Sequence, residues 1–145
     1  MKIKVKKLDP DAIIPSHLLH GDAGLDLHSI EDKILSPGER YPVKTGLAFE
    51  LPEGYVGLLW DKSGTAFKTG LKTMGGVMDC TYRGEYMVLI WNTTSSKFAI
   101  KKGDKIAQVL IQPVASVEIE EVGELSKSIR GEHSFGTADE VKKKL

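Results

Sequence analysis

Short apolar runs separated by glycine- and proline-containing turns recur along the chain. Two of them, Tyr55–Trp60 (YVGLLW) and Tyr86–Trp91 (YMVLIW), each follow a turn that contains a glycine. Short runs of this kind, rich in β-branched and aromatic residues, are typical of an all-β sandwich or barrel. The other runs that we expect to form strands are Lys2–Lys6, Tyr41–Leu47, Ile106–Val114 and Val117–Val122.

The two strongest runs, Tyr55–Trp60 and Tyr86–Trp91, are apolar at nearly every position rather than at every second position. A strand with that pattern is covered on both faces, either by a second sheet or by another subunit. Because an all-β subunit of this length buries a modest core, the pattern favours an oligomer.

Helical signals are weak by comparison. The segment Ser63–Leu71 (SGTAFKTGL) has room for one or two helical turns, although Gly64 and Gly70 weaken a helix there. The C-terminal stretch Ala138–Leu145 predicts a short terminal helix that frays.

The chain beyond residue 125 differs in composition from the rest. Ser126–Asp139 contains glycines and serines but few apolar residues, which is typical of a mobile arm rather than of a packed strand. We therefore expect a β core over residues 1–125 and a flexible C-terminal arm over residues 126–145.

Length, charge and cysteine content narrow the class of protein. The 145 residues fit one domain, and 20 Lys and Arg balance 20 Asp and Glu, so no overall basic excess favours nucleic-acid binding. No apolar run reaches the roughly 20 residues of a membrane span, and the lysine-rich N-terminus lacks the apolar stretch of a signal peptide. The single cysteine, Cys80, excludes an intrachain disulfide and a zinc site of clustered thiolates. We expect a cytoplasmic protein with neither nucleic acid nor membrane as partner.

Two segments combine small residues with a charged side chain. In AGLDL, Asp26 lies between two leucines, where a carboxylate needs either a partner or a solvated face; the alternative is an aspartate on the outer face of a strand. In KSGTA, Lys62 and Ser63 precede Gly64 in a turn whose backbone N–H groups suit a phosphate. The alternative there is an ordinary surface loop.

The segment Gly75–Glu85 (GGVMDCTYRGE) carries the most specific pattern. Paired glycines lead into a short run that ends at Asp79, and Tyr82 begins a turn towards the next strand. The pattern predicts a hairpin with an acid and an aromatic ring at its closed end. Glycines allow a planar ligand to approach the backbone closely, and a carboxylate there can act as general base towards a water. The alternative is an ordinary hairpin whose Asp79 caps the turn.

Two further segments hold polar groups at unusual places. Gln108 lies in the otherwise apolar run of GDKIAQV, and a buried glutamine needs hydrogen-bond partners, which either a ligand or a neighbouring strand supplies. Near the C-terminus, RGEHSFGT contains an arginine to clamp phosphate and a phenylalanine to stack on a base. The sequence contains no P-loop, no dinucleotide-binding GxGxxG and no HExxH motif, and its four histidines have no metal-ligand spacing.

In this order, the segments AGLDL, KSGTA, GGVMDCTYRGE, GDKIAQV and RGEHSFGT resemble the five motifs of the trimeric deoxyuridine triphosphate nucleotidohydrolases, the dUTPases. The resemblance extends from Ala23 to Thr137. It is most specific in the third motif, where an aspartate is followed three residues later by Tyr-Arg-Gly. It implies a β jelly roll, a homotrimer with shared active sites, and Mg²⁺-assisted hydrolysis of dUTP to dUMP and pyrophosphate.

The resemblance also implies roles for individual residues. Asp79 would activate the water that attacks the α-phosphorus, and Tyr82 would pack under the deoxyribose and exclude a 2′-hydroxyl. Asp26 would support the Mg²⁺ shell through water. The uracil would contact Gly76, Val77, Met78 and Met87. The phosphates would contact Lys62, Ser63, Gly64 and Gln108, and the arm would add Arg130, Phe135 and Gly136.

The chain departs from the motifs at five positions. Cys80 and Thr81 occupy positions in the third motif that are often acidic or small. Lys62 stands where the family commonly has arginine, which removes bidentate phosphate binding but keeps the charge. His133 and Ser134 stand where the arm commonly has two glycines. These differences leave open a regulatory protein of the same fold that binds nucleotide and hydrolyses it weakly. A dCTP deaminase or bifunctional relative is a third reading, although Gly75–Tyr82 contains no glutamate to shuttle protons at a base.

Overall fold

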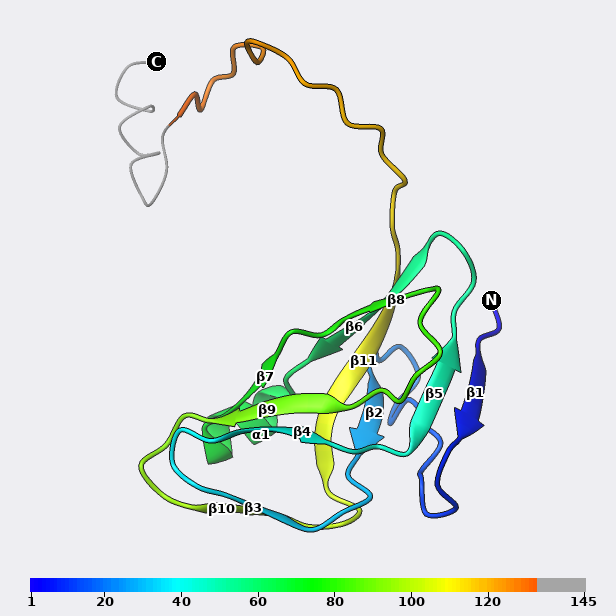
Figure 1. Ribbon diagram of the computed structural model, residues 1–145, viewed down its shortest axis with the longest axis vertical. Coiled ribbons are helices and arrows are strands. Elements are labelled where there is room, and N and C mark those ends of the chain that lie inside the picture. Colours follow the sequence, from blue (N-terminus) through cyan, green and yellow to red (C-terminus); the bar gives the residue numbers. More distant parts are fainter. Residues whose placement is uncertain (133–145) are drawn as a thin grey trace.

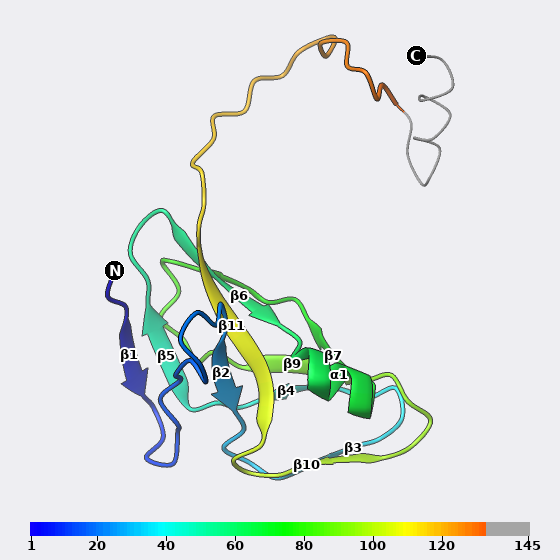
Figure 2. The ribbon, with the colours of Figure 1, turned by 180° about the vertical axis from the view of Figure 1, so that it is seen from behind.

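The computed structural model describes residues 1–132, which form eleven strands and one short helix in that part of the chain (Figures 1 and 2). In chain order the elements are β1 (Lys4–Lys7), β2 (Leu25–His28), β3 (Lys33–Leu35), β4 (Arg40–Val43), β5 (Leu47–Glu50), β6 (Tyr55–Trp60), α1 (Ser63–Thr69), β7 (Leu71–Met74), β8 (Val77–Asp79), β9 (Val88–Asn92), β10 (Phe98–Ile100) and β11 (Lys105–Pro113).

All strand pairs in these sheets are antiparallel. One sheet has four strands in the order β2-β11-β6-β8 and another has three in the order β4-β9-β7, while β1 pairs with β5 and β3 with β10. The predicted all-β sandwich is confirmed. The sheets remain open in the described residues, so the barrel alternative does not apply.

One hydrophobic core joins the larger sheets. Strand β9 shows the alternation that builds it, because Val88, Ile90 and Asn92 are buried while the residues between them are partly exposed. From the four-stranded sheet, Leu27 and Val109 enter the same core and are fully buried. The side-chain amide of Asn92 donates to the carbonyls of Leu35 at the end of β3, of Ser36 and of Ser96, which satisfies this polar group within the core.

The predicted helical segment forms one short helix, α1, between β6 and β7 (Figure 2). It ends at Gly70, which adopts φ 65° and donates its N–H to Ala66 O at 3.0 Å. Glycine suits this left-handed position because it has no Cβ. The glycine that weakens the helical pattern therefore stops the helix.

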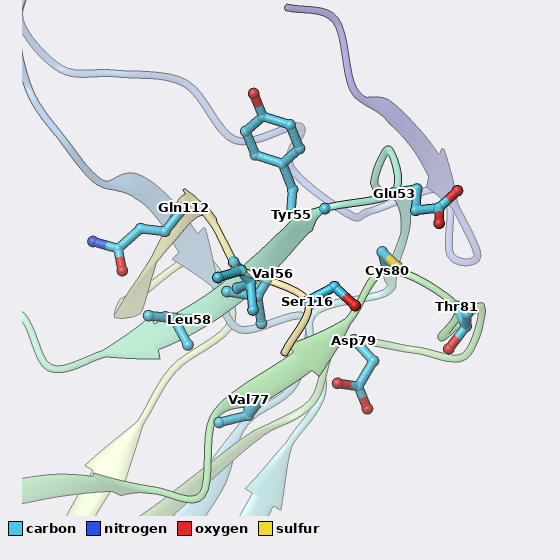
Figure 3. Close-up of a pocket in the computed structure, with 13 residues that line it drawn as sticks. Glu53, Tyr55, Val56, Leu58, Val77, Asp79, Cys80, Thr81, Gln112 and Ser116 are labelled. Carbon is cyan, nitrogen blue, oxygen red and sulfur yellow. The ribbon is translucent and has the colours of Figure 1, made fainter. Parts of the chain in front are cut away.

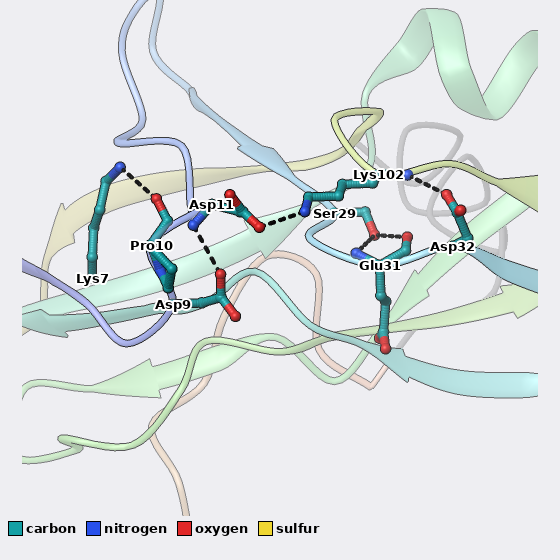
Figure 4. A network of polar contacts seen from close by, with 8 residues as sticks. All are labelled: Lys7, Asp9, Pro10, Asp11, Ser29, Glu31, Asp32 and Lys102. Atoms are coloured by element: carbon teal, nitrogen blue, oxygen red, sulfur yellow. Dashed lines mark hydrogen bonds and ion pairs between the residues drawn. The ribbon is translucent and has the colours of Figure 1, made fainter.

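A polar network ties the N-terminal loop to the body (Figure 4). Lys102 lies in the turn before β11. Its ammonium group pairs with Asp11 at 2.5 Å, and the backbone N–H of the same residue donates to Asp32 at 2.8 Å. The loop itself is closed by the N–H of Asp11, which donates to Asp9 at 2.8 Å. Three segments distant in sequence are thus joined at one corner of the fold.

The prediction of a strand over Val117–Val122 is wrong. After β11 the described chain runs away from the body without regular structure (Figure 1), and Ile119 is 90% exposed. The alternating pattern is present, but no strand in the described part of the chain pairs with it. The predicted helix over Ala138–Leu145 lies outside the described residues. Within residues 1–132, no helix is long and apolar enough to cross a membrane.

Candidate active site

The turn after β8 presents Asp79 and Tyr82 at the surface. Asp79 ends the strand, and its carbonyl accepts the N–H of Tyr82 at 3.0 Å. The guanidinium of Arg83 donates to the carbonyls of Cys80 at 2.6 Å and of Tyr82 at 2.9 Å, which closes the turn. Both Asp79 and Tyr82 remain exposed, so the carboxylate and the ring are accessible to a ligand.

The sequence pattern predicts that this turn closes a hairpin, and that prediction is wrong. Strand β8 pairs with β6, whereas β9 pairs with β4 and β7, so the chain passes here from one sheet to the other. The reason lies in the residues after the turn: Glu85 forms a β-bridge with Ala48, and the N–H of Tyr86 donates to Leu47 O at 2.8 Å. These bonds draw the chain towards β5 before β9 begins.

An open cleft of about 630 Å³ lies beside Asp79 (Figure 3). Val77 and Asp79, two residues apart, share one face of β8 and both line it, as Figure 3 shows. The opposite wall comes from β6 and from the chain that follows β11. The other residues that line the cleft are Glu53, Gly54, Tyr55, Val56, Leu58, Cys80, Thr81, Gln112, Val114, Ala115 and Ser116.

Gly76 holds the start of β8 tightly against β6. Its φ is +101°, and a Cβ at this position would lie 2.8 Å from the carbonyl oxygen of Leu59. The carbonyl of Gly76 in turn accepts the N–H of Leu59 at 2.8 Å. A side chain here would strain the backbone and break this approach. Beside it, Val77 is exposed, as is Met87 after the turn, so apolar atoms are available for a planar ligand.

A second polar region lies at the other end of β6, where the chain enters α1. A cavity of about 370 Å³ is lined there by Lys62, Ser63, Gly64 and Gln108, together with Thr65, Lys68 and Thr69. The side-chain amide of Gln108 donates to Asp61 O at 2.9 Å. A Cβ at Gly24 would lie 2.1 Å from Gln108 Oε1, so this glycine leaves the space that the glutamine side chain occupies.

Asp26 joins two lysines in this second region. It is 6% exposed; Lys105 contacts one carboxylate oxygen at 2.7 Å and Lys62 contacts the other. Burial alone would raise the pKa of Asp26, but hydrogen bonds from Lys105 and Lys62 outweigh it and hold the pKa below its ordinary value. Two ammonium groups share one carboxylate, so the cluster keeps a net positive charge that suits an anionic ligand.

The same cluster decides how a divalent cation would be held. Both oxygens of Asp26 are taken by ammonium groups, and residues 1–132 contain no group of three His, Cys, Asp or Glu placed to hold a metal ion. These residues do not fit a direct all-protein Mg²⁺ site. They are compatible with a Mg²⁺ that arrives on phosphates and keeps its waters.

The two polar regions lie apart within one chain. Asp79 is opposite Val56 near the start of β6, whereas Gln108 is opposite Trp60 at its end. Four residues of strand separate these positions by roughly 13 Å. The structure therefore brings Lys62, Ser63, Gly64 and Gln108 together, and Asp79 with Val77, but it does not unite the two groups.

Comparison with known proteins identifies the family. The dUTPase family model matches residues 11–138. The chain is 48% identical to the deoxyuridine 5′-triphosphate nucleotidohydrolase of Nautilia profundicola over 139 residues, covering 94% of this chain and 98% of that protein. It is 42% identical to the enzyme of Clostridioides difficile, covering 93% and 96%. The chain belongs to the dUTPase family.

Solved structures of dUTPases have the same fold. The dUTPase of Staphylococcus bacteriophage 80alpha with dUPNHPP matches with a TM-score of 0.89 and 33% identity, over 94% of this chain and 97% of that one. A mutant dUTPase of phage phi11 of S. aureus, described for the coordination of a structural Mg(II) ion, matches with a TM-score of 0.81 and 31% identity, over 86% and 98%. The expected dUTPase fold is thereby confirmed.

Some residues of the dUTPase motifs lie outside these two regions. Arg130 is exposed on the segment beyond β11, and Phe135 and Gly136 lie outside the described residues, as do His133 and Ser134. Sequence reasoning missed Lys105, although its motif GDKIAQV was recognised. It also missed Asp61, which accepts the N–H of Thr73 at 2.6 Å and so fixes the loop before α1. Neither residue carries a sequence signal of its own, because each acts through a partner distant in sequence.

Proposed function

We propose that this protein hydrolyses dUTP to dUMP and pyrophosphate, and that Asp79 is the general base. The observation that carries the proposal is membership of the dUTPase family together with an accessible carboxylate at Asp79, on the same exposed turn as Tyr82. A related phage dUTPase of 33% identity has been solved with dUPNHPP. The presence of both Asp79 and Tyr82 at this turn supports the assignment as a hydrolase.

In the proposed reaction, a water attacks the α-phosphorus. Its proton passes to the carboxylate of Asp79, and the bond from the α-phosphorus to the bridging oxygen of the β-phosphate breaks, so that pyrophosphate leaves. Because Asp79 is exposed at the end of β8, a water bound between its carboxylate and the nucleotide needs no rearrangement of the core. Positioned proton transfer of this kind contributes about 10²–10⁴-fold in rate.

We assign the phosphate chain to the region at the start of α1. Lys62 and Lys105 supply positive charge around Asp26, and the cavity edge adds two hydrogen-bond donors, the hydroxyl of Ser63 and the side-chain NH₂ of Gln108. Charge neutralisation and alignment are the main demands of phosphoryl transfer. Mg²⁺ bound to the phosphates would supply further charge neutralisation there. Asp26 acts in this assignment through its two lysines and through water.

The sugar and base are assigned to the turn after β8. The exposed ring of Tyr82 would pack against the deoxyribose and leave no space for a 2′-hydroxyl. The backbone from Gly76 to Met78, with Met87 across the turn, offers N–H and C=O groups to the uracil edge between apolar side chains. Arg130, Phe135 and Gly136 would complete the site from the C-terminal arm.

We further propose that a homotrimer shares its active sites between subunits. A base must lie within hydrogen-bond reach of the water it activates, and that water lies at the phosphates. Within one chain, Asp79 and Gln108 flank opposite ends of β6. In a trimer, the Lys62 region of a second copy can lie beside Asp79 of the first, so that the base and the phosphates meet in one site.

The test is a pyrophosphate-release assay with dUTP and Mg²⁺, run in parallel with UTP and dCTP. We expect fast release from dUTP and little from the other two. Tight nucleotide binding without release would favour the regulatory reading. Ammonia release from dCTP would favour the deaminase reading.

A further inference from the structure

Three aromatic rings form a continuous cluster between the core and the turn after β8. Tyr86 is fully buried, and its ring stacks on that of Phe49 with the centroids 4.3 Å apart and the planes at 27°. The ring of Tyr86 also stacks on that of Tyr82, with the centroids 6.1 Å apart and the planes at 29°. Tyr82 itself is 41% exposed. We call these three residues the aromatic cluster.

Tyr86 is the fixed member of the aromatic cluster. Its N–H donates to Leu47 O at 2.8 Å, and its carbonyl accepts the hydroxyl of the fully buried Thr45 at 2.7 Å. A Cβ at Gly57 would lie 3.3 Å from Tyr86 Oη, so the ring fills the space that a side chain on β6 would need. The hydrogen bonds at the N–H and carbonyl of Tyr86, and the tight packing of its ring over Gly57, hold the ring in one position.

Tyr82 is held by fewer constraints of its own. Its hydroxyl donates to Glu85 O at 3.2 Å across the turn. A Cβ at Gly84 would lie 2.3 Å from Tyr82 Oη, so the ring folds over a position that has no side chain. The turn leaves room for the ring, but packing against a rigid neighbour is what fixes a ring plane.

We infer that Tyr86 is a positioning residue that sets the discrimination between deoxyribose and ribose, because it fixes the ring of Tyr82 against the sugar. The inference rests on the proposed function, in which Tyr82 excludes a 2′-hydroxyl. Exclusion by contact requires a ring that does not yield. A Tyr82 ring that can tilt makes room for the hydroxyl, and UTP becomes a substrate.

The ring of Tyr86, rather than its hydroxyl, performs this role. Among residues 1–132 no group hydrogen-bonds Tyr86 Oη. Burial raises the pKa of Tyr86 to about 12, so the phenol stays neutral over the working range of pH. Phenylalanine at this position keeps both stacking contacts, whereas leucine removes them.

The experiment compares the ratio of kcat/KM for dUTP to that for UTP in four proteins: the wild type, Tyr86→Leu, Tyr86→Phe and Val88→Ala. Val88 is fully buried two residues further along the same segment, so its truncation is the control for lost stability. We expect Tyr86→Leu to lower the ratio by about tenfold or more, as misplacement of a contact group does. Tyr86→Phe restores the wild-type ratio, and Val88→Ala lowers Tm but keeps the ratio.

An unchanged ratio in folded Tyr86→Leu would overturn the inference, as would an equal loss in Val88→Ala. If Tyr86→Leu does not fold, the same ratio measured on Tyr86→Met decides, because methionine adapts to the shape of the buried space but has no ring to stack on Tyr82; a wild-type ratio there overturns the inference. A wild type that releases no pyrophosphate from dUTP would instead contradict the proposed function. A wild type that hydrolyses dUTP and UTP equally would contradict the role of Tyr82.

Discussion

At the scale of single residues, Asp79 carries the strongest prediction. Asp79→Asn removes the proton acceptor but keeps the size of the side chain, and the residue is exposed. We expect the melting temperature and nucleotide binding to stay close to those of the wild type, while turnover falls by about 10²–10⁴-fold. Steady-state pyrophosphate release beside a thermal melt measures both. Wild-type turnover in Asp79→Asn would show that another group is the base.

Asp26 makes a prediction about acid stability. Its lysine partners hold its folded-state pKa below the ordinary value, and the unfolded chain has the ordinary pKa of about 3.9. The ion pairs therefore stabilise the fold above about pH 4, and this contribution is lost as pH falls through the lower folded-state pKa. Asp26→Asn should reduce stability at neutral pH and flatten the dependence of Tm on pH between neutrality and acid. Parallel pH profiles of Tm for both proteins would contradict this role.

The residues of the site were predictable in type but not in partnership. The sequence indicated that Asp26 needs a partner and that Lys62 suits a phosphate, and the structure makes each the partner of the other. Lys105 joins them from β11, 79 positions beyond Asp26 along the chain. The pair of Asp26 with Lys105 depends on the register of β2 against β11, and Lys62 reaches Asp26 from the loop after β6; no local pattern specifies either arrangement.

At the scale of elements, the contact between β2 and β11 can be tested at Gly24. A methyl group at this position would lie 2.1 Å from Gln108 Oε1, so Gly24→Ala must displace the glutamine side chain. We expect a higher KM for dUTP with the fold retained, because a flexible side chain yields before the backbone does. The matched control is Gly123→Ala, where nothing lies within 4 Å of the added group. Equal KM values for both variants would remove Gln108 from the substrate site.

Local patterns predicted the elements better than their pairing. Tyr55–Trp60 forms a strand with the expected bounds, and Ser63–Leu71 contains the expected short helix. The hairpin at Asp79 was wrong because Glu85 and Tyr86 bond to β5 before β9 begins. Whether a turn joins two strands of one sheet or crosses between sheets depends on such distant bonds, and the turn sequence itself is the same in both cases.

At the scale of the whole molecule, we expect removal of the chain beyond residue 125 to lower activity without lowering stability. The described part, residues 126–132, is exposed and lies outside the sheets. Truncation before Ser126 should leave Tm nearly unchanged. It removes Arg130 and Phe135, so we expect turnover of dUTP to fall by about 10²-fold through lost alignment of the phosphates. Full turnover without these residues would exclude the arm from the site, and a lowered Tm would make it structural.

The apolar surface of the subunit predicts its assembly. Trp60, Phe67 and Val77 are exposed, and so is the alternating stretch Val117–Val122, a strand pattern with which nothing in residues 1–132 pairs. Exposed apolar side chains and an unpaired strand pattern are features that a neighbouring subunit can cover in an oligomer. We expect a trimer by light scattering at low micromolar concentration.

Shared sites make a sharper prediction than the mass alone. Asp79→Asn and Lys62→Ala should each be inactive as pure proteins, since each removes one half of every site. When the two are unfolded together and refolded as a mixture, mixed trimers contain some sites built from an intact Asp79 of one chain and an intact Lys62 of another. Activity should then return in part. The control is the same treatment of each variant alone. If both variants are inactive and the mixture forms trimers without any recovery of activity, each site must draw both residues from one chain, and the separation of Asp79 from Gln108 along β6 would have to close within the subunit.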